Sequence, residues 1–289
     1  MRDLYDTAEA ARMFSLLMLV MGAAPILAPL AGGQLLLFTG WRGIFGFLGV
    51  FGVISFVVSL VWLPESLPRE KRSDYSIVEM VTGYGSLFRQ RQYLLYAVAL
   101  GAIAGFNFSY IAGAPQLFIE LQGISPQHFG IIFGLNAFGL IGSSQLNRAL
   151  LRRYTSEQIL SLSFTVNLLG ALLLTVSTMT GIGGFPAQLV LLFLCLCTTG
   201  LLYPNVTALA LAPFAAAAGT ASALLGTIQY ALGATAGAFV GMFHNGTSLP
   251  MILTMTFCAV VGRLAIMFAQ SPGNMHEPAL GGVEAEAAP

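Results

Sequence analysis

The chain has 289 residues, of which 56% are apolar and only 8% are charged, and its formal net charge is zero. A soluble domain is about half apolar and about a quarter charged, so these few charges exclude a soluble globular protein of this size. The ionisable residues lie between long apolar stretches rather than in one basic patch, and no nucleic-acid partner is therefore expected.

The long apolar stretches predict an all-α polytopic membrane protein in contact with the lipid bilayer. A bilayer core about 30 Å thick needs roughly 17–25 mostly apolar residues per helix, and eight segments reach that length. The expected spans are 14–38, 44–63, 93–114, 130–150, 159–180, 186–211, 221–243 and 249–269. Pro25, Pro29 and Pro204 lie inside them, which a buried bundle tolerates but which predicts kinks.

The connection at 64–92 is charged and contains two prolines, as expected of a cytoplasmic linker between two helical bundles. We therefore expect 1–63 to be the last two helices of an N-terminal bundle, 93–270 to be a six-helix C-terminal bundle, and 271–289 to be a disordered cytoplasmic tail.

The distribution of Lys and Arg predicts the orientation in the membrane, because short loops rich in these residues stay in the cytoplasm. Starting inside, the cytoplasmic side collects Arg2, Arg12, Arg69, Lys71, Arg72, Arg89, Arg91, Arg148, Arg152 and Arg153. The outside loops contain only Arg42, and Arg263 lies within the last span. Both termini are therefore predicted to be cytoplasmic.

The first span and its flanks carry the most specific local pattern, RDLYDTAEAAR, LMLVMGAAPILAPLAGGQLL, GWRGIFGF and LPESL. This pattern resembles the fifth and sixth helices of the major facilitator superfamily, in particular its Bcr/CflA group of bacterial drug resistance transporters. The antiporter motif of that fifth helix, small-xxx-Gly-Pro-xx-Gly-Gly, corresponds here to Ala24, Ala28, Pro29, Gly32 and Gly33. Both leading glycines are alanine, which is still small enough for close helix approach. The later stretches NRALLRRYTSEQIL, LLYPNVTALAL and AGTASALLGTIQYALGATAGAFVG are similar to the same group.

The resemblance implies a secondary active transporter in the bacterial inner membrane that exports small hydrophobic or cationic drugs in exchange for protons. It implies no cofactor, the proton gradient being the energy source, and no enzyme activity. The eight spans would correspond to helices 5–12 of twelve, with the first four helices and the acidic first-helix residue lying outside this sequence. The alternative is a transport-inactive membrane fragment or a mis-called start, whose partner would be the missing N-terminal helical portion.

Polar side chains inside the spans are the candidates for a substrate cavity. These candidates are Asn107, Tyr110, Asn136, Ser143, Tyr203, Asn205, Gln229 and Tyr230. Asn136 and Ser143 belong to one stripe at helical spacing that also includes Asn147, whereas Tyr203 and Asn205 flank the proline that is expected to break the sixth span. Two roles are compatible with these side chains: lining a cavity, or hydrogen bonding between helices at about 0.6 kcal/mol apiece.

The seventh span contains a glycine pattern that predicts close helix packing, since glycine lets two backbones approach. Its members are Gly226, Gly233, Gly237 and Gly241. No carboxylate lies convincingly in any span, so no proton carrier is visible. The histidines His128, His244 and His276 have no metal-ligand spacing, and no catalytic or metal-binding residue is expected.

Overall fold

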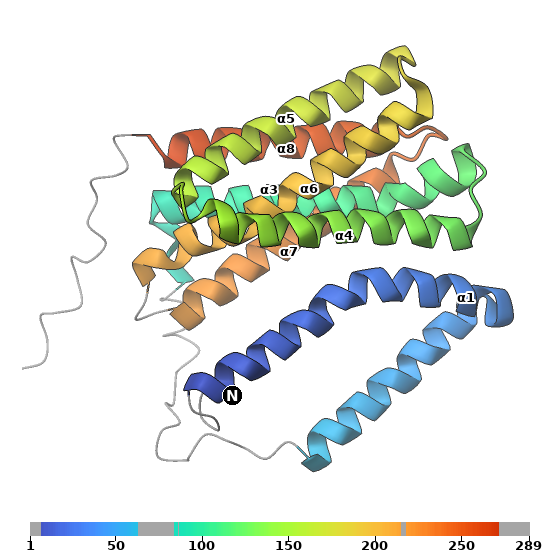
Figure 1. Cartoon of the computed structure of the whole chain (residues 1–289), viewed down its shortest axis with the longest axis horizontal. Coiled ribbons are helices and arrows are strands. Elements are labelled where there is room, and N and C mark those ends of the chain that lie inside the picture. Colours follow the sequence, from blue (N-terminus) through green and yellow to red (C-terminus); the bar gives the residue numbers. More distant parts are fainter. Residues whose placement is uncertain (1–6, 63–83, 86, 215–217, 272–289) are drawn as a thin grey trace, which may run out of the picture. The chain divides into compact units, whose positions relative to one another are not determined.

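The computed structural model describes residues 7–62, 84–85, 87–214 and 218–271, and within these ranges it is helical with no strand. The elements in chain order are α1 (Thr7–Trp62), α3 (Arg91–Pro115), η2 (Gln116–Leu121), α4 (Pro126–Leu150), α5 (Ser156–Thr180), α6 (Gly184–Leu211), η3 (Ala212–Phe214), α7 (Ala218–Met242) and α8 (Leu249–Ala269) (Figure 1). Side chains are described for residues 27–28, 31–62, 84–85, 87–214 and 219–271. The expected all-α fold is confirmed for these residues.

Seven helical segments among the described residues are long and apolar enough to cross a membrane, where the sequence predicts eight. These segments are Ala31–Trp62, Arg91–Leu121, Pro126–Leu150, Ser156–Thr180, Gly184–Phe214, Gly219–Met242 and Leu249–Ala269. The difference lies in α1, because most of the expected span 14–38 precedes the residues whose side chains are described, and this span is therefore not tested. Within α1, Gly40 has a φ of 66°, a left-handed conformation that favours glycine. This kink falls between the two expected spans 14–38 and 44–63, and residues 31–62 on both sides of it form a single candidate segment.

The helix boundaries agree closely with the predicted spans except in two places. The loop expected at 115–129 is shorter, because Pro115 has helical angles and the chain continues through the π-helical turn η2 to Leu121. A π-turn accommodates an extra residue without ending the helix. The break expected at Pro204 is absent, since α6 continues from Gly184 to Leu211 with this proline inside it.

Local sequence explains where α5 begins and ends. Thr155 and Gln158 form a capping box, in which the Thr155 Oγ1 accepts a hydrogen bond from the Gln158 N–H at 3.3 Å. The Gln158 Oε1 accepts in return from the Thr155 N–H at 3.1 Å. The helix ends at Gly181, whose φ of 75° suits a residue without a Cβ.

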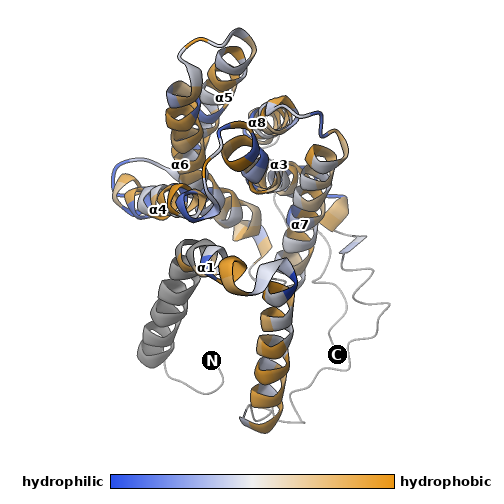
Figure 2. Ribbon diagram, turned by 90° about the vertical axis from the view of Figure 1, so that its right-hand side faces the viewer, coloured by the Kyte–Doolittle hydropathy of each residue, from blue (hydrophilic) through white to orange (hydrophobic). Residues whose placement is uncertain are grey.

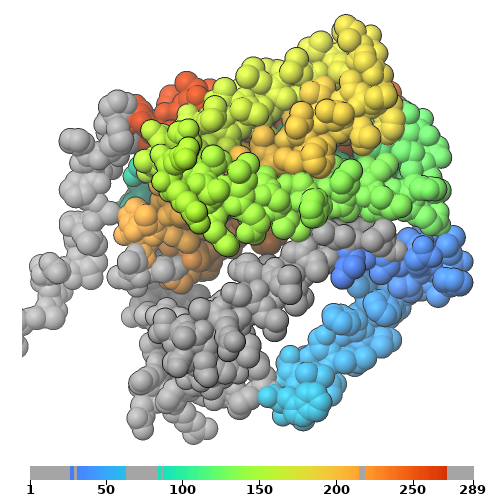
Figure 3. Space-filling view, in the orientation of Figure 1, coloured from blue at the N-terminus to red at the C-terminus, as the bar shows by residue number. Residues whose placement is uncertain are grey.

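The chain divides into two compact units, residues 1–76 with 123–138 and residues 77–122 with 139–289. In the second unit α3 is the central helix and packs against α6, α7 and α8, while α5 packs against α6 and α8. The side chains of α5 and α6 fill the space between these two helices on the face seen in Figure 3. Hydrophobic residues also run along the outward sides of helices such as α5 (Figure 2), with Leu162 67% and Leu173 58% exposed. Apolar surface on the outside is what a lipid environment requires.

The predicted linker at 64–92 lies mostly outside the described residues, although α3 begins at Arg91, two residues before the expected span. The predicted tail also lies outside them apart from Ser271. The division into 1–63, 64–92, 93–270 and 271–289 stays a prediction.

Candidate functional site

Four of the predicted cavity residues come together from three helices of the second unit. The hydroxyl of Tyr203 on α6 interacts with the side chains of Asn107 on α3 and Gln229 on α7, and Tyr230 of α7 lies close by. We call these four residues the Tyr203 cluster. Helical periodicity alone does not bring them together, because Tyr203 is separated from its two partners by 96 and 26 positions in the sequence.

The close packing of α7 on α3 positions this cluster. Gln229, Gly233 and Gly237 are spaced four residues apart and therefore share one face of α7. A Cβ at Gly233 would lie 3.1 Å from a ring carbon of Phe108, and one at Gly237 would lie 3.5 Å from the Phe108 carbonyl oxygen. The absence of these side chains lets α7 approach α3, and the rings of Phe108 and Tyr230 then meet edge to face with centroids 6.3 Å apart.

The Tyr203 cluster offers hydrogen bonding without formal charge. A tyrosine hydroxyl and two side-chain amides donate and accept, although the Asn107 Nδ2 already donates to the Ile103 carbonyl oxygen at 2.9 Å. Tyr230 is 62% exposed and presents an aromatic face that suits an apolar or cationic group. The arrangement can therefore hold a hydrophobic or cationic molecule by stacking and orient it by neutral hydrogen bonds.

Asn205 forms a hydrogen bond between helices, whereas Ser143 bonds within its own helix. Asn205 is 1% exposed, and its Nδ2 donates to the Asn147 Oδ1 at 2.7 Å and to the Leu201 carbonyl oxygen at 2.8 Å. The Ser143 hydroxyl donates to the Leu140 carbonyl oxygen at 2.8 Å. Both donor hydrogens of Asn205 are thus used within the protein, which favours the interhelical role for this residue.

Tyr110 and Asn136 are buried, 3% and 4% exposed, and both take part in interactions within the protein. Tyr110 lies in the second unit and Asn136 in the first. Their assignment to a substrate cavity stays a prediction.

The antiporter motif is described only in part, because the side chains of Ala24 and Pro29 lie outside the described residues. Ala28 is exposed, and a Cβ at Gly32 would meet no atom within 4 Å. A Cβ at Gly33 would lie 3.5 Å from the Pro126 carbonyl oxygen, which places this glycine against the start of α4 in the same unit.

The four glycines of the predicted packing face of α7 have different surroundings. Gly233 and Gly237 contact α3, whereas a Cβ at Gly226 or Gly241 would meet no atom within 4 Å. The other half of this contact was missed: Gly101 and Gly105 of α3, in the sequence GAIAG, face Leu232 and Ala236 of α7. Their four-residue spacing is the signal that could have identified them.

Two polar contacts between elements were also missed. Asn167 of α5 is 2% exposed, and its Nδ2 donates to the Thr198 Oγ1 at 2.8 Å and to the Cys195 carbonyl oxygen at 3.2 Å. A single asparagine within an apolar span was the available signal. The Glu120 carboxylate and the His244 Nε2 lie 3.7 Å apart, and across the described residues no three potential metal ligands gather.

Seven candidate spans and outward apolar surfaces among the described residues define a multi-pass helical membrane protein. Residues 1–238 match the family model of the Major Facilitator Superfamily, and the chain belongs to this family of transporters. The family gives no basis for an enzyme activity.

The relatives include drug resistance proteins of bacteria. The chain is 34% identical over 267 residues to the uncharacterized MFS-type transporter YdgK of Bacillus subtilis, covering 91% of this chain and 66% of that protein. It is 26% identical over 271 residues to the bicyclomycin resistance protein homolog of Haemophilus influenzae, covering 94% and 68%. It is 30% identical over 234 residues to multidrug resistance protein D of Escherichia coli, covering 79% and 56%. The chain is thus similar to transporters of the Bcr/CflA type and spans about two thirds of the length of the first two relatives.

Proposed function

We propose that this chain acts in the export of small hydrophobic or cationic compounds across the bacterial inner membrane, driven by the proton gradient. The observation that carries the proposal is the Tyr203 cluster, which combines neutral hydrogen-bonding groups with an exposed aromatic ring. The names of two relatives, a bicyclomycin resistance protein homolog and a multidrug resistance protein, support the export of drugs.

In this proposal the substrate lies against Tyr230 and Phe108 and takes hydrogen bonds from the Tyr203 hydroxyl and the Gln229 amide. Neutral partners of this kind distinguish substrates weakly, because neither amide nor hydroxyl demands a particular charge or shape. Broad specificity for apolar and cationic molecules follows. Transport then proceeds by rocking of two helical bundles about a site near the middle of the membrane, the general mechanism of such transporters.

The orientation is part of the proposal. Both termini and the connection at 64–92 are cytoplasmic, because ten of the Lys and Arg residues fall on that side and Arg42 alone falls in an outside loop.

An efflux assay with a fluorescent hydrophobic cation tests the proposal. Proteoliposomes under an imposed proton gradient would contain the 289-residue chain, or the same chain extended by four N-terminal spans, and each would be compared with its Tyr203→Phe variant. We expect gradient-dependent efflux that an uncoupler abolishes and that Tyr203→Phe lowers. Efflux that persists with the uncoupler would contradict proton coupling.

The second candidate function, a transport-inactive membrane fragment, is decided by the same assay. Efflux from the extended chain but not from the 289-residue chain favours that alternative for the shorter form. Equal efflux from both would show that residues 1–289 suffice for transport.

A further inference from the structure

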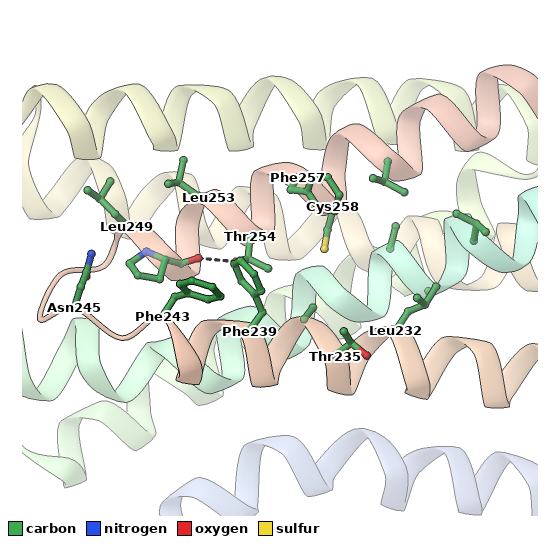
Figure 4. A pocket seen from close by; sticks show the side chains of 16 residues that line it. Leu232, Thr235, Phe239, Phe243, Asn245, Leu249, Leu253, Thr254, Phe257 and Cys258 are labelled. Atoms are coloured by element: carbon green, nitrogen blue, oxygen red, sulfur yellow. Dashed lines mark hydrogen bonds between the residues drawn. The ribbon is translucent and has the colours of Figure 1, made fainter.

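A groove with a volume of about 760 Å³ lies between α7 and α8, with α3 as its floor (Figure 4). It forms because α7 and α8 each pack extensively on α3 but contact each other little. Gly101, Ala102 and Gly105 of α3 explain this geometry, since their small side chains let both neighbours approach α3 without bringing the neighbours together. None of the four residues of the Tyr203 cluster lines the groove.

The lining of the groove is mostly apolar, with Asn245 at one end. None of its lining residues is charged, and its few hydroxyl groups already donate within their own helices: Thr235 to the Ala231 carbonyl oxygen at 2.8 Å and Thr254 to the Pro250 carbonyl oxygen at 2.7 Å. These threonines therefore present methyl groups to an occupant. The rings of Phe239 and Phe243, with centroids 4.2 Å apart and planes tilted by 36°, form part of the α7 wall.

The length of the groove matches one leaflet of a bilayer. Its α8 wall runs from Leu249 to Val261, which at about 1.5 Å per residue is about 18 Å. Half of a bilayer core about 30 Å thick is about 15 Å. The groove thus begins at the connection between α7 and α8, and its length is slightly more than half the thickness of a bilayer core.

The end of the groove at the α7–α8 connection has a hydrogen-bond donor. Asn245 lies there beside Phe243 and Leu249 (Figure 4). Its Oδ1 accepts hydrogen bonds from the Thr247 N–H at 3.1 Å and from the Thr247 hydroxyl at 2.7 Å. In the part of the chain that the structure describes, its Nδ2 has no acceptor, so this amide can donate to a phosphate or ester oxygen.

We propose that this groove binds one acyl chain of a membrane phospholipid, with the head group at Asn245. An occupant from the surrounding medium must be apolar over about 18 Å and carry acceptor oxygens at one end, and a phospholipid of the leaflet on the Asn245 side has this chemistry. The exposed rims, Leu253 at 49% and Phe257 at 67%, allow the chain to enter sideways from the bilayer. This inference does not depend on the proposed transport activity.

Native mass spectrometry of the purified chain, after reconstitution with phosphatidylethanolamine and phosphatidylglycerol and extraction in mild detergent, tests the proposal. Thr235→Trp fills the groove at an exposed position of α7. Thr227→Trp is its matched control, because Thr227 is exposed on the same helix, makes the same hydrogen bond to the carbonyl four residues earlier, and does not line the groove. We expect one phospholipid to stay bound to the wild type and to Thr227→Trp, and to be retained about tenfold less by Thr235→Trp.

Asn245→Asp provides a second variant that keeps the groove intact. The aspartate keeps an oxygen that accepts from Thr247 but loses the amide donor and repels a phosphate, so lipid retention should fall. If both tryptophan variants lost the phospholipid equally, or if neither lost it, the retained lipid would be bound non-specifically at the protein surface, and the proposal would be overturned. Retention of a second protein chain or of an added hydrophobic cation in place of the phospholipid would also overturn it, and unchanged retention in Asn245→Asp would overturn the head-group placement.

Discussion

The side chain of Asn205 on α6 donates a hydrogen bond to the side chain of Asn147 on α4 at 2.7 Å. The two asparagines are 58 residues apart in the sequence, and their bond joins α4 to α6. Both side chains are buried, 1% and 4% exposed. A polar bond at this depth stabilises the helix pair because lipid offers no alternative partner, although the unfolded state within a membrane reduces its net value.

We predict that this bond contributes about 0.6 kcal/mol and no more than about 1.7 kcal/mol to stability. The measurement is a double-mutant cycle with Asn205→Ala, Asn147→Ala and both together, followed by unfolding in mixed detergent micelles. Because the bond needs both side chains, the double variant should lose less than the sum of the single losses. Strictly additive losses would mean that the two asparagines do not interact.

The glycines of α7 should differ in their tolerance of a large side chain. Gly237 lies against the Phe108 backbone, whereas a Cβ at Gly241 would meet open space. Gly237→Leu should therefore separate α7 from α3 and lower the folded yield and thermal midpoint in detergent, by about 1–3 kcal/mol in stability. The matched control Gly241→Leu should behave like the wild type. Equal effects of the two substitutions would place the contact elsewhere on α7.

Removing the hydroxyl group of Tyr93 should affect stability, whereas removing that of Tyr203 should affect transport. The Tyr93 hydroxyl donates to the Ala221 carbonyl oxygen at 2.7 Å in the buried core, so Tyr93→Phe should lower stability by about 1 kcal/mol and leave efflux unchanged. Tyr203→Phe should raise the KM for a hydrogen-bonding substrate with little loss of stability. Thermal midpoints and efflux kinetics of both variants, in the chain that is active in the efflux assay, provide the measurements. The reverse pattern would remove the Tyr203 cluster from the substrate path.

Cysteine labelling should verify the orientation. The native Cys195 and Cys258 are buried, and Cys197, which is only partly buried, is replaced by serine. Single cysteines introduced at Tyr75, Gln122 and Thr247 then report on their own positions. A membrane-impermeant maleimide added to intact spheroplasts should label the Gln122 and Thr247 positions but label the Tyr75 position only after lysis. Any reversal of this pattern would contradict the Lys and Arg rule for this chain.

The sequence by itself determined that the chain is a helical membrane protein, and it located most helix ends within a few residues. Hydropathy is summed along the chain, and a helix in lipid satisfies its own backbone hydrogen bonds, so neither property depends on neighbouring helices. The family was also visible in short local patterns, and the match over residues 1–238 agrees with that resemblance. The continuation through Pro115 was missed because a π-turn depends on packing rather than on a residue's helix propensity.

The tertiary structure alone decided which polar residues meet. Tyr203 and Asn205 are two positions apart, yet Tyr203 contacts Asn107 and Gln229 whereas Asn205 is bound to Asn147. Helical periodicity shows which residues share a face of one helix, but the rotation and height of that helix relative to its neighbours come from packing against all of them at once. For the same physical reason, the middle glycines of α7 contact α3 and the outer ones do not.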